Sequence, residues 1–348
     1  MQKIGCPYGT HRVISPHGVL PQPAWKIDNT MTLYDNEILL DVERLNIDSA
    51  SFTEIKGRAH RDEAAIRKII LELVKERGKH HNPNTGSGGM FIGKVRAIGD
   101  KLIGKIDLRP GDRIASLVSL SLTPLDIEEI EAVHMDIDQV EVKGQAILFE
   151  SGIYAKLPDD MPEALALAVL DVAGAPAQTA KLVRPGDKVL VIGGGGKSGL
   201  LCLHEAKKRA GITGQVISLN PSTTACERVQ NLNLADTVIQ ADAQNALQVM
   251  ETVSLATGGK MCDLVINCVN VPNTEMSTIL AARNHGTVYF FSMATSFTAA
   301  ALGAEGVGKD ITMLIGNGYT TDHAAIALNT LRENPKLREL FESTYVTR

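Results

Sequence analysis

A strand, a turn made of glycine and a helix follow one another between residues 188 and 210. Residues 188–192 are apolar after the first one, the next four residues are all glycine, and apolar side chains recur at helical spacing from Leu200 to Ala206. Because glycine has no Cβ, such a turn allows backbone N–H groups to approach a pyrophosphate at the start of a helix. The order of these elements therefore predicts a nicotinamide-dinucleotide site, and a purely structural glycine turn is the alternative.

Two alignments of these glycines with the dinucleotide fingerprint are open. Gly194, Gly196 and Gly199 have the spacing G-x-G-x-x-G, whereas Gly193 and Gly195 fit it with one residue inserted. The predicted cofactor contacts in this turn are Gly193, Gly194, Gly195, Gly196, Lys197, Ser198 and Gly199.

The end of the next predicted strand, 215–220, bears on the choice of cofactor. An acidic residue here accepts hydrogen bonds from the adenosine ribose diol of NAD, but this chain has Asn220. A neutral side chain does not repel a 2′-phosphate, and Arg228 on the following helix can reach one. We therefore favour NADP over NAD and predict cofactor contacts from Asn220, Ser222, Thr223 and Arg228. The alternative is that Asn220 only begins a turn before Pro221.

Further strands are predicted at 236–239, 263–269 and 286–292, and helical segments separate them. Alternating strands and helices indicate a doubly wound parallel sheet, in which ligands bind at the carboxyl ends of the strands. We therefore expect the nicotinamide to be bordered by Cys268, Val269, Ser292 and Met293.

Composition excludes several classes of protein. The chain has 348 residues and a net charge of −5, which suits two globular domains and gives no reason to attract nucleic acid or anionic lipid. No apolar run reaches membrane-spanning length, and residues 1–6 lack the apolar core of a signal peptide. Five cysteines without a C-x-x-C pair argue against disulfides and a zinc knuckle. We expect a cytoplasmic enzyme with no nucleic-acid or membrane partner.

The chain before residue 186 is mostly β in character, with strands predicted at 37–45, 89–99 and 109–118. Between the first two, residues 61–77 carry apolar side chains at helical spacing, which predicts a helix that packs on a core. An apolar helical stretch from residue 163 leads into the dinucleotide-binding part.

These segments, together with Pro110-Gly-Asp-Arg and Pro185-Gly-Asp-Lys, resemble the medium-chain dehydrogenase/reductase family. The resemblance implies a mostly β GroES-like catalytic domain (1–165, with a helical insertion at 61–77), a Rossmann domain (166–304) and a C-terminal return to the catalytic domain (305–348). We also expect a homodimer or a higher homo-oligomer. Zinc-dependent members carry a Cys where this chain has Asp48 and a His where it has Ser87, so we expect no metal, with His80 and His81 as loop residues.

A narrower resemblance is carried by residues 8–29, the 61–77 helix and Gly86-Ser-Gly-Gly-Met. These are similar to the L-erythro-3,5-diaminohexanoate dehydrogenase family of lysine fermentation. The resemblance implies oxidative deamination of (3S,5S)-3,5-diaminohexanoate, a small diamino acid, to 5-amino-3-oxohexanoate and ammonia, with hydride transfer to NAD(P). The alternatives are a zinc-free quinone or enone reductase of the same larger family and a non-catalytic NADP-binding sensor.

The implied reaction needs a base, because an ammonium group cannot release hydride until it has lost a proton. The resemblance places Asp48 on a loop at the active site, and Asp171 interrupts an apolar helical stretch where an unpaired carboxylate is costly. An ordinary turn residue at 48 and a buried structural carboxylate at 171 are the alternatives.

Other candidates lie on segments expected to be loops. We predict Glu54, Lys56 and His60, after Asp48, as further acid–base candidates, with solvated loop charges as the alternative. Arg12, beside His11, is expected to hold the substrate carboxylate. Tyr319 is expected either to reach the substrate or to cover a core.

Overall fold

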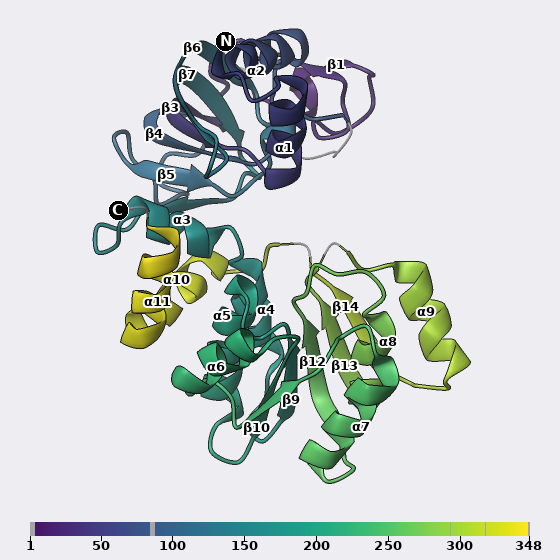
Figure 1. Ribbon diagram of the computed structural model, residues 1–348. Helices are drawn as coiled ribbons and strands as arrows, with labels where there is room; N and C mark the ends of the chain where they lie inside the picture. Colours follow the sequence, from purple (N-terminus) through teal and green to yellow (C-terminus); the bar gives the residue numbers. More distant parts are fainter. Residues whose placement is uncertain (1–3, 84–87, 293, 317, 347–348) are drawn as a thin grey trace. The chain divides into compact units, whose positions relative to one another are not determined.

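The computed structural model describes residues 4–83, 88–292, 294–316 and 318–346. The chain divides into two compact units, residues 1–159 and 160–348 (Figure 1). The predicted boundaries at 165 and 304 stay predictions. No helix among the described residues is long and apolar enough to cross a membrane.

The first unit is built on a six-stranded sheet of order β6-β7-β3-β4-β5-β8 in which every neighbouring pair is antiparallel. Its central strand β3 is mostly buried, with Leu40 and Leu45 fully inside the core. The strands are β3 Glu37–Asn46, β4 Met90–Ile98, β5 Arg113–Ser116, β6 Leu125–His134, β7 Gln139–Phe149 and β8 Tyr154–Lys156. A short turn η1 (Thr10–Arg12), the pair β1 (Val13–Ser15) and β2 (Lys26–Ile27), and η2 (Leu120–Leu122) complete the unit.

Two helices lie between β3 and β4, α1 (Ser49–Arg58) and α2 (Glu63–Arg77). Asp48 and Asp62 cap them, since each carboxylate accepts a backbone N–H in the first turn. Helix α2 is the helix predicted at 61–77, and it buries Ile66, Ile70 and Val74. The expectation of a loop after Asp48 is wrong, because the capped segment forms α1.

The second unit contains a parallel six-stranded sheet of order β11-β10-β9-β12-β13-β14. Its strands are β9 Lys188–Ile192, β10 Gln215–Asn220, β11 Thr237–Gln240, β12 Cys262–Asn267, β13 Ala282–Phe290 and β14 Thr312–Ile315. The order reverses between β9 and β12, so the crevice in which such sheets bind ligands lies at the carboxyl ends of these strands. The predicted fold class, a mostly β domain with a doubly wound parallel sheet, is confirmed.

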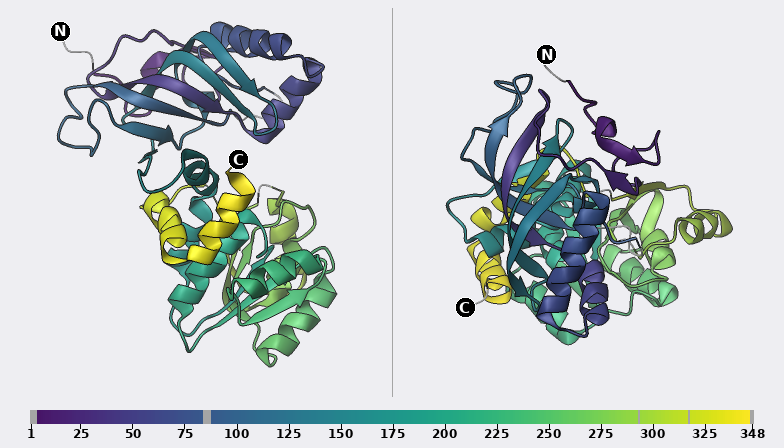
Figure 2. Two further views of the ribbon diagram at one scale, coloured as in Figure 1. Left: turned by 60° about the vertical axis from the view of Figure 1, so that its left-hand side comes forward. Right: turned by 90° about the horizontal axis from the view of Figure 1, so that it is seen from above.

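Helices cover both faces of this sheet (Figures 1 and 2), with α4 and α5 side by side on one face and α7 and α8 on the other. The helices are α3 Glu163–Leu170, α4 Gly174–Leu182, α5 Lys197–Ala210, α6 Thr223–Asn231, α7 Ala246–Thr257, α8 Glu275–Ala281, α9 Phe297–Gly306, α10 His323–Glu333 and α11 Pro335–Tyr345. The last two helices pack against α3, and α10 also packs against α4 and α5. The C-terminal segment thereby completes the second unit.

Candidate functional site

The glycine turn joins β9 to α5 at the switch point of the parallel sheet. Gly193 has a left-handed backbone (φ 80°), and its N–H donates to the Leu219 carbonyl at 2.8 Å. A Cβ on Gly199 would overlap the Gly193 carbonyl, so only glycine permits the helix to lie so near the turn. Helix α5 begins after Gly196 with no side-chain cap among the described residues, which leaves its first N–H groups for an anion such as pyrophosphate.

Asn220, at the carboxyl end of β10, is buried and holds this turn in place. Its Oδ1 accepts from the Gly195 N–H at 2.6 Å, and its Nδ2 donates to Ser218 Oγ at 2.9 Å. Arg228 on α6 donates from Nη1 to the Gly195 carbonyl at 2.7 Å. Two of the predicted cofactor residues, Asn220 and Arg228, therefore both contact a third, Gly195.

The remaining residues predicted for the adenosine end lie at the start of α6. Ser222 caps this helix, because its Oγ accepts from the Ala225 N–H at 3.3 Å. Thr223 follows it, with Oγ1 3.3 Å from Gln240 Oε1, and both hydroxyl-bearing residues are exposed. The exposed start of α6 therefore lies close in the sequence to Asn220, the last residue of β10.

The nicotinamide-side candidates lie after β12 and β13. The Cys268 N–H donates to the Ile192 carbonyl at 3.0 Å, and the Val269 side chain would contact any Cβ added to Gly193. Ser292 Oγ lies 3.5 Å from Asn270 Oδ1. Met293 lies outside the described residues, as does Ser87 of the first unit.

Asp171 corrects one expectation. Helix α3 ends at Leu170, and Asp171 lies in the break before α4 with an exposed side chain, so it is not a buried structural carboxylate. Its Oδ2 accepts from Lys197 Nζ at 2.5 Å. Because Lys197 is the first residue of α5, this ion pair lies directly beside the glycine turn. Ser198 follows in the same turn of α5.

In the first unit, Asp48 has one bonded and one unbonded carboxylate oxygen. Oδ1 accepts from the Ser51 N–H at 3.0 Å as the cap of α1. Oδ2 is buried and has no hydrogen-bond partner in the part of the chain that the structure describes. The cap bond therefore holds the carboxylate in one orientation, with Oδ2 buried and not bonded by any described residue.

The other residues of this segment are held by local contacts. Glu54 accepts from Asn82 Nδ2, and Lys56 donates to the Met135 carbonyl and to Asp138 Oδ1 at 2.9 Å. His60 is exposed just after α1, with φ at 49°. Of the acid–base candidates in this unit, Asp48 alone has an unbonded buried oxygen among the described residues.

Arg12 is a structural residue, contrary to expectation. It is 1% exposed, and its guanidinium makes five hydrogen bonds, to both oxygens of Glu37 at 2.6 Å and to the carbonyls of Asp28, Thr30 and Thr32. These bonds use all of its N–H donors, so none is left for a substrate carboxylate. His11 Nε2 donates to the same Glu37 at 2.9 Å, because His11 Nδ1 accepts from the Cys6 N–H.

Tyr319 in the second unit is 43% exposed and packs edge-on against His323, with ring centroids 5.1 Å apart. This placement leaves part of the ring accessible and part of it against α10.

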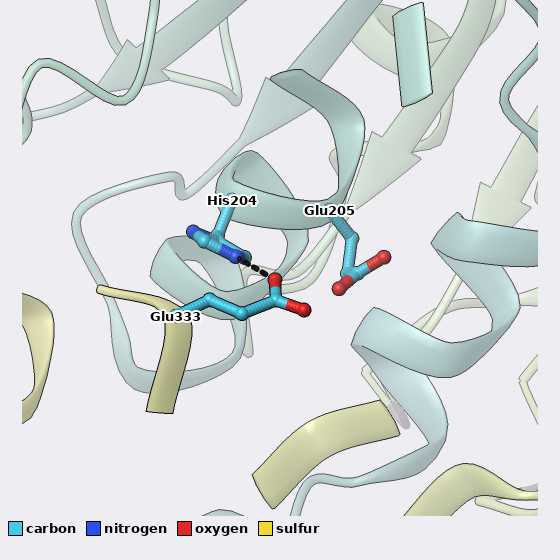
Figure 3. A group of neighbouring side chains, drawn as sticks. All are labelled: His204, Glu205 and Glu333. Atoms are coloured by element: carbon cyan, nitrogen blue, oxygen red, sulfur yellow. Dashed lines mark hydrogen bonds and ion pairs between the residues drawn. The ribbon is translucent and has the colours of Figure 1, made fainter. Parts of the chain in front are cut away.

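One group of side chains has the composition of a metal site but is an ion-pair cluster. His204, Glu205 and Glu333 bring potential ligand atoms within 4.8 Å of one another (Figure 3). Lys208 Nζ, however, donates to both oxygens of Glu333 at 2.6 and 2.8 Å, and Arg209 pairs with Glu205 at 3.3 Å. Since cations already occupy the carboxylates, these residues join α5 to the end of α10.

Sequence reasoning missed His80. It lies outside helices and strands, as expected, but it is completely buried, and neither ring nitrogen has a hydrogen-bond partner among the described residues. Burial lowers the pKa of His80 to about 4, although the nearby charge of Asp48 acts in the opposite direction. The imidazole is therefore neutral at pH values near 7.

Comparison with known proteins gives long matches. The family model for the L-erythro-3,5-diaminohexanoate dehydrogenase N-terminal domain matches residues 11–158. The L-erythro-3,5-diaminohexanoate dehydrogenase of Acetoanaerobium sticklandii is 62% identical over 342 residues, 98% of this chain and 99% of the relative. The enzyme of the same name from Fusobacterium nucleatum is 60% identical over 344 residues, 99% of this chain and all of the relative.

Solved structures share the fold at low identity. AibC matches with a TM-score of 0.55 and 16% identity, covering 86% of this chain and 78% of that one. A mycobacterial protein in complex with NADPH matches with a TM-score of 0.54 and 17% identity, covering 92% and 85%. These similarities extend over both units and support the medium-chain dehydrogenase/reductase fold.

Proposed function

The chain belongs to the L-erythro-3,5-diaminohexanoate dehydrogenase family, and from this premise we propose that it catalyses oxidative deamination of (3S,5S)-3,5-diaminohexanoate. The products are 5-amino-3-oxohexanoate and ammonia, and a nicotinamide cofactor accepts the hydride. The observation that carries the proposal is identity of 60% or more over almost the whole of both chains in two relatives. Nothing in the comparisons favours a quinone or enone reductase or a sensor.

For the cofactor we propose NADP, with NAD as the alternative. Asn220 puts no negative charge where the ribose would bind, and the guanidinium of Arg228 lies against the glycine turn. The exposed hydroxyls of Ser222 and Thr223 are donors for phosphate oxygens. Together these residues offer one cation and two hydroxyls to a 2′-phosphate.

We propose Asp48 as the base that takes a proton from the C3 ammonium. Once that nitrogen is neutral, the nicotinamide takes hydride from the carbon that bears it, and an iminium remains. A carboxylate also attracts an ammonium substrate, so the same group binds and deprotonates it. Asp171, the second acidic candidate, is exposed and already pairs with Lys197, which favours a role beside the cofactor.

The proposal includes no metal. Among the described residues, one group of His, Cys, Asp and Glu offers three ligand atoms to an ion, and lysine and arginine neutralise its carboxylates. A proton taken by a carboxylate and a hydride taken by the nicotinamide account for the oxidation. Homo-oligomeric assembly and a cytoplasmic location stay predictions.

The test is turnover by the purified full-length chain with the diamino acid and either NADP or NAD, read as reduced nicotinamide and released ammonia. Asp48→Asn should lower kcat about 10²–10⁴-fold, because asparagine cannot take the proton. Asparagine still caps a helix, so α1 should persist. Asp62→Asn, at the matching cap of α2, is the control and should keep wild-type kcat. Reduction of enones or quinones without deamination of the diamino acid would refute the proposal.

A further inference from the structure

Of the buried side-chain atoms that lack a hydrogen-bond partner in the described part of the first unit, three belong to two residues that flank Gly88 and Gly89. They are Asp48 Oδ2 and the imidazole of His80, whose two ring nitrogens are both unbonded within the described ranges. Burial lowers the pKa of His80, and the negative charge of Asp48 and the backbone of Gly88 both act in the opposite direction. The carboxylate is therefore within electrostatic range of the ring.

Backbone packing keeps the two residues together. A Cβ on Gly89 would overlap the Asn46 carbonyl and lie 2.8 Å from the Asp48 nitrogen. A Cβ on Gly88 would lie 2.5 Å from the His80 carbonyl and 2.7 Å from the Ser121 nitrogen. The adjacent residues 88 and 89 thus contact His80 on one side and Asp48 on the other.

Leaving such groups unbonded is costly. A buried donor or acceptor without a partner costs about 1–3 kcal/mol each, and buried polar groups in proteins are nearly always satisfied by protein or by ordered water. Asp48 cannot turn its free oxygen toward another backbone N–H, because the cap of α1 fixes the carboxylate. A bound molecule with hydrogens to donate would satisfy both groups at once.

We propose that Asp48 Oδ2 and the His80 ring together hold the water molecule that hydrolyses the iminium. This inference rests on the proposed deamination, in which water must replace nitrogen at C3. A water that donates one hydrogen to the carboxylate and the other to a neutral imidazole nitrogen has its lone pairs directed away from both. Those lone pairs are then free to attack an electrophilic carbon.

The step balances without an oxidant. Asp48 first releases to solvent the proton that it took from the C3 ammonium. The water oxygen then forms a bond to C3 of the iminium, the C=N electron pair moves to nitrogen, and a water proton passes to Asp48. Asp48 returns this proton to the nitrogen, which makes ammonia the leaving group. The C–N bond then breaks, a C=O bond forms, and the hydroxyl proton passes through Asp48 to the departing ammonia. His80 acts through the water and is a positioning residue.

The test separates hydride transfer from hydrolysis. When His80→Leu enzyme loaded with NADP is mixed with the diamino acid, the first hydride transfer should keep its rate while steady-state kcat falls about 10²-fold. One reduced nicotinamide per subunit should therefore form in a rapid burst before slow turnover. His80→Gln should recover part of kcat, because its amide oxygen accepts a hydrogen from the water.

The unfolding midpoint is a second readout, because it should fall when a purely structural histidine is replaced. In this proposal the His80 ring bonds the water but no protein atom among the described residues. Replacing it by leucine therefore breaks no bond within the protein and removes a desolvation cost, so the unfolding midpoint of His80→Leu should be unchanged or higher. The control is His81→Leu, since the ring of His81 lies 3.3 Å from Arg77 Nη1 instead of being unbonded. It should keep wild-type kcat and show no burst.

Several outcomes would overturn the inference. A first turnover slowed in proportion to kcat would place His80 in the hydride step, and wild-type kcat in His80→Leu would remove it from the reaction. A large drop in the unfolding midpoint would make it structural. If the wild-type chain does not deaminate the diamino acid at all, the proposed function fails instead. Wild-type deamination activity thus distinguishes failure of the proposed function from failure of the role given to His80.

Discussion

Removing one partner of the buried Arg12–Glu37 pair should destabilise the first unit severely. In Arg12→Met, Glu37 stays fully buried and loses two bonds of 2.6 Å from the guanidinium. Breaking a buried ion pair on one side costs about 3–5 kcal/mol, because the remaining charge is uncompensated. His11 still donates to Glu37, which places the expected loss near 3 kcal/mol at the lower end of that range.

This loss converts into a measurable shift of the unfolding midpoint. For a domain of about 150–250 residues, each kcal/mol moves the midpoint by about 2–4 °C, so Arg12→Met should lower it by roughly 6–12 °C. The control is Arg113→Met, whose partner Glu43 lies at 2.6 Å but is exposed. Exposed pairs contribute at most about 1 kcal/mol, and the midpoint should hardly move.

The pH dependence has a definite sign. Burial raises the pKa of Glu37, but hydrogen bonds from Arg12 and His11 and the charge of Arg12 outweigh it, so the pKa lies below its usual value. A carboxyl group with a lowered pKa in the folded state stabilises the protein above its unfolded pKa. That contribution is lost as pH falls through the folded pKa. Wild-type stability should therefore decline in acid, and Arg12→Met should decline less steeply.

The assay is thermal unfolding followed by circular dichroism, combined with KM for the diamino acid at a temperature where both proteins are folded. KM should stay within about threefold of wild type, since a shift of tenfold would need 1.4 kcal/mol of substrate binding. The double variant with Glu37→Met should recover much of the stability. A small loss of stability with a KM raised tenfold or more would refute the structural assignment and return Arg12 to the substrate.

Three further outcomes are expected. Asn220→Asp and Arg228→Gln should each lower the ratio of kcat/KM for NADP over NAD, because one adds a repelling charge and the other removes a cation; an unchanged ratio in both would place the 2′-phosphate elsewhere. Lys197→Met should weaken cofactor binding, measured by nicotinamide fluorescence. Asp171→Asn should lower kcat less than Asp48→Asn does, and a larger loss of kcat in Asp171→Asn would make Asp171 the base. Dialysis against a chelator should leave kcat unchanged, and recovery of lost activity by zinc would contradict the metal-free proposal.

The second unit could be predicted from the sequence because its signals are local. The glycine turn, the buried strands and the apolar helix faces each lie within a few neighbouring residues. The strand expected at 286–292 begins earlier, at Ala282, because α8 ends at Ala281 and the chain pairs at once with β12. That pairing is a tertiary contact, which no local pattern records.

The first unit was less predictable for physical reasons. Strands β6 and β7 pair along most of their length, but many residues of β6 are exposed, so hydrophobic alternation is faint. The role of Arg12 depends on carbonyls of residues 28, 30 and 32 that the fold brings to it. The burial of His80 depends on close backbone contacts at Gly88, and a single histidine in a loop gives no pattern to read.

The strand order of the parallel sheet has a consequence for the chain while it is being synthesised. Strand β9 is almost entirely apolar and pairs with β10 on one edge and β12 on the other. The second partner begins at Cys262, about 70 residues after β9 ends. At about 5–20 residues per second, a ribosome leaves that edge uncovered for roughly 4–14 seconds. During this interval a nascent chain exposes an unpaired apolar edge to its neighbours on the same polysome, so the yield of soluble protein should depend on how quickly translation proceeds from β9 to β12.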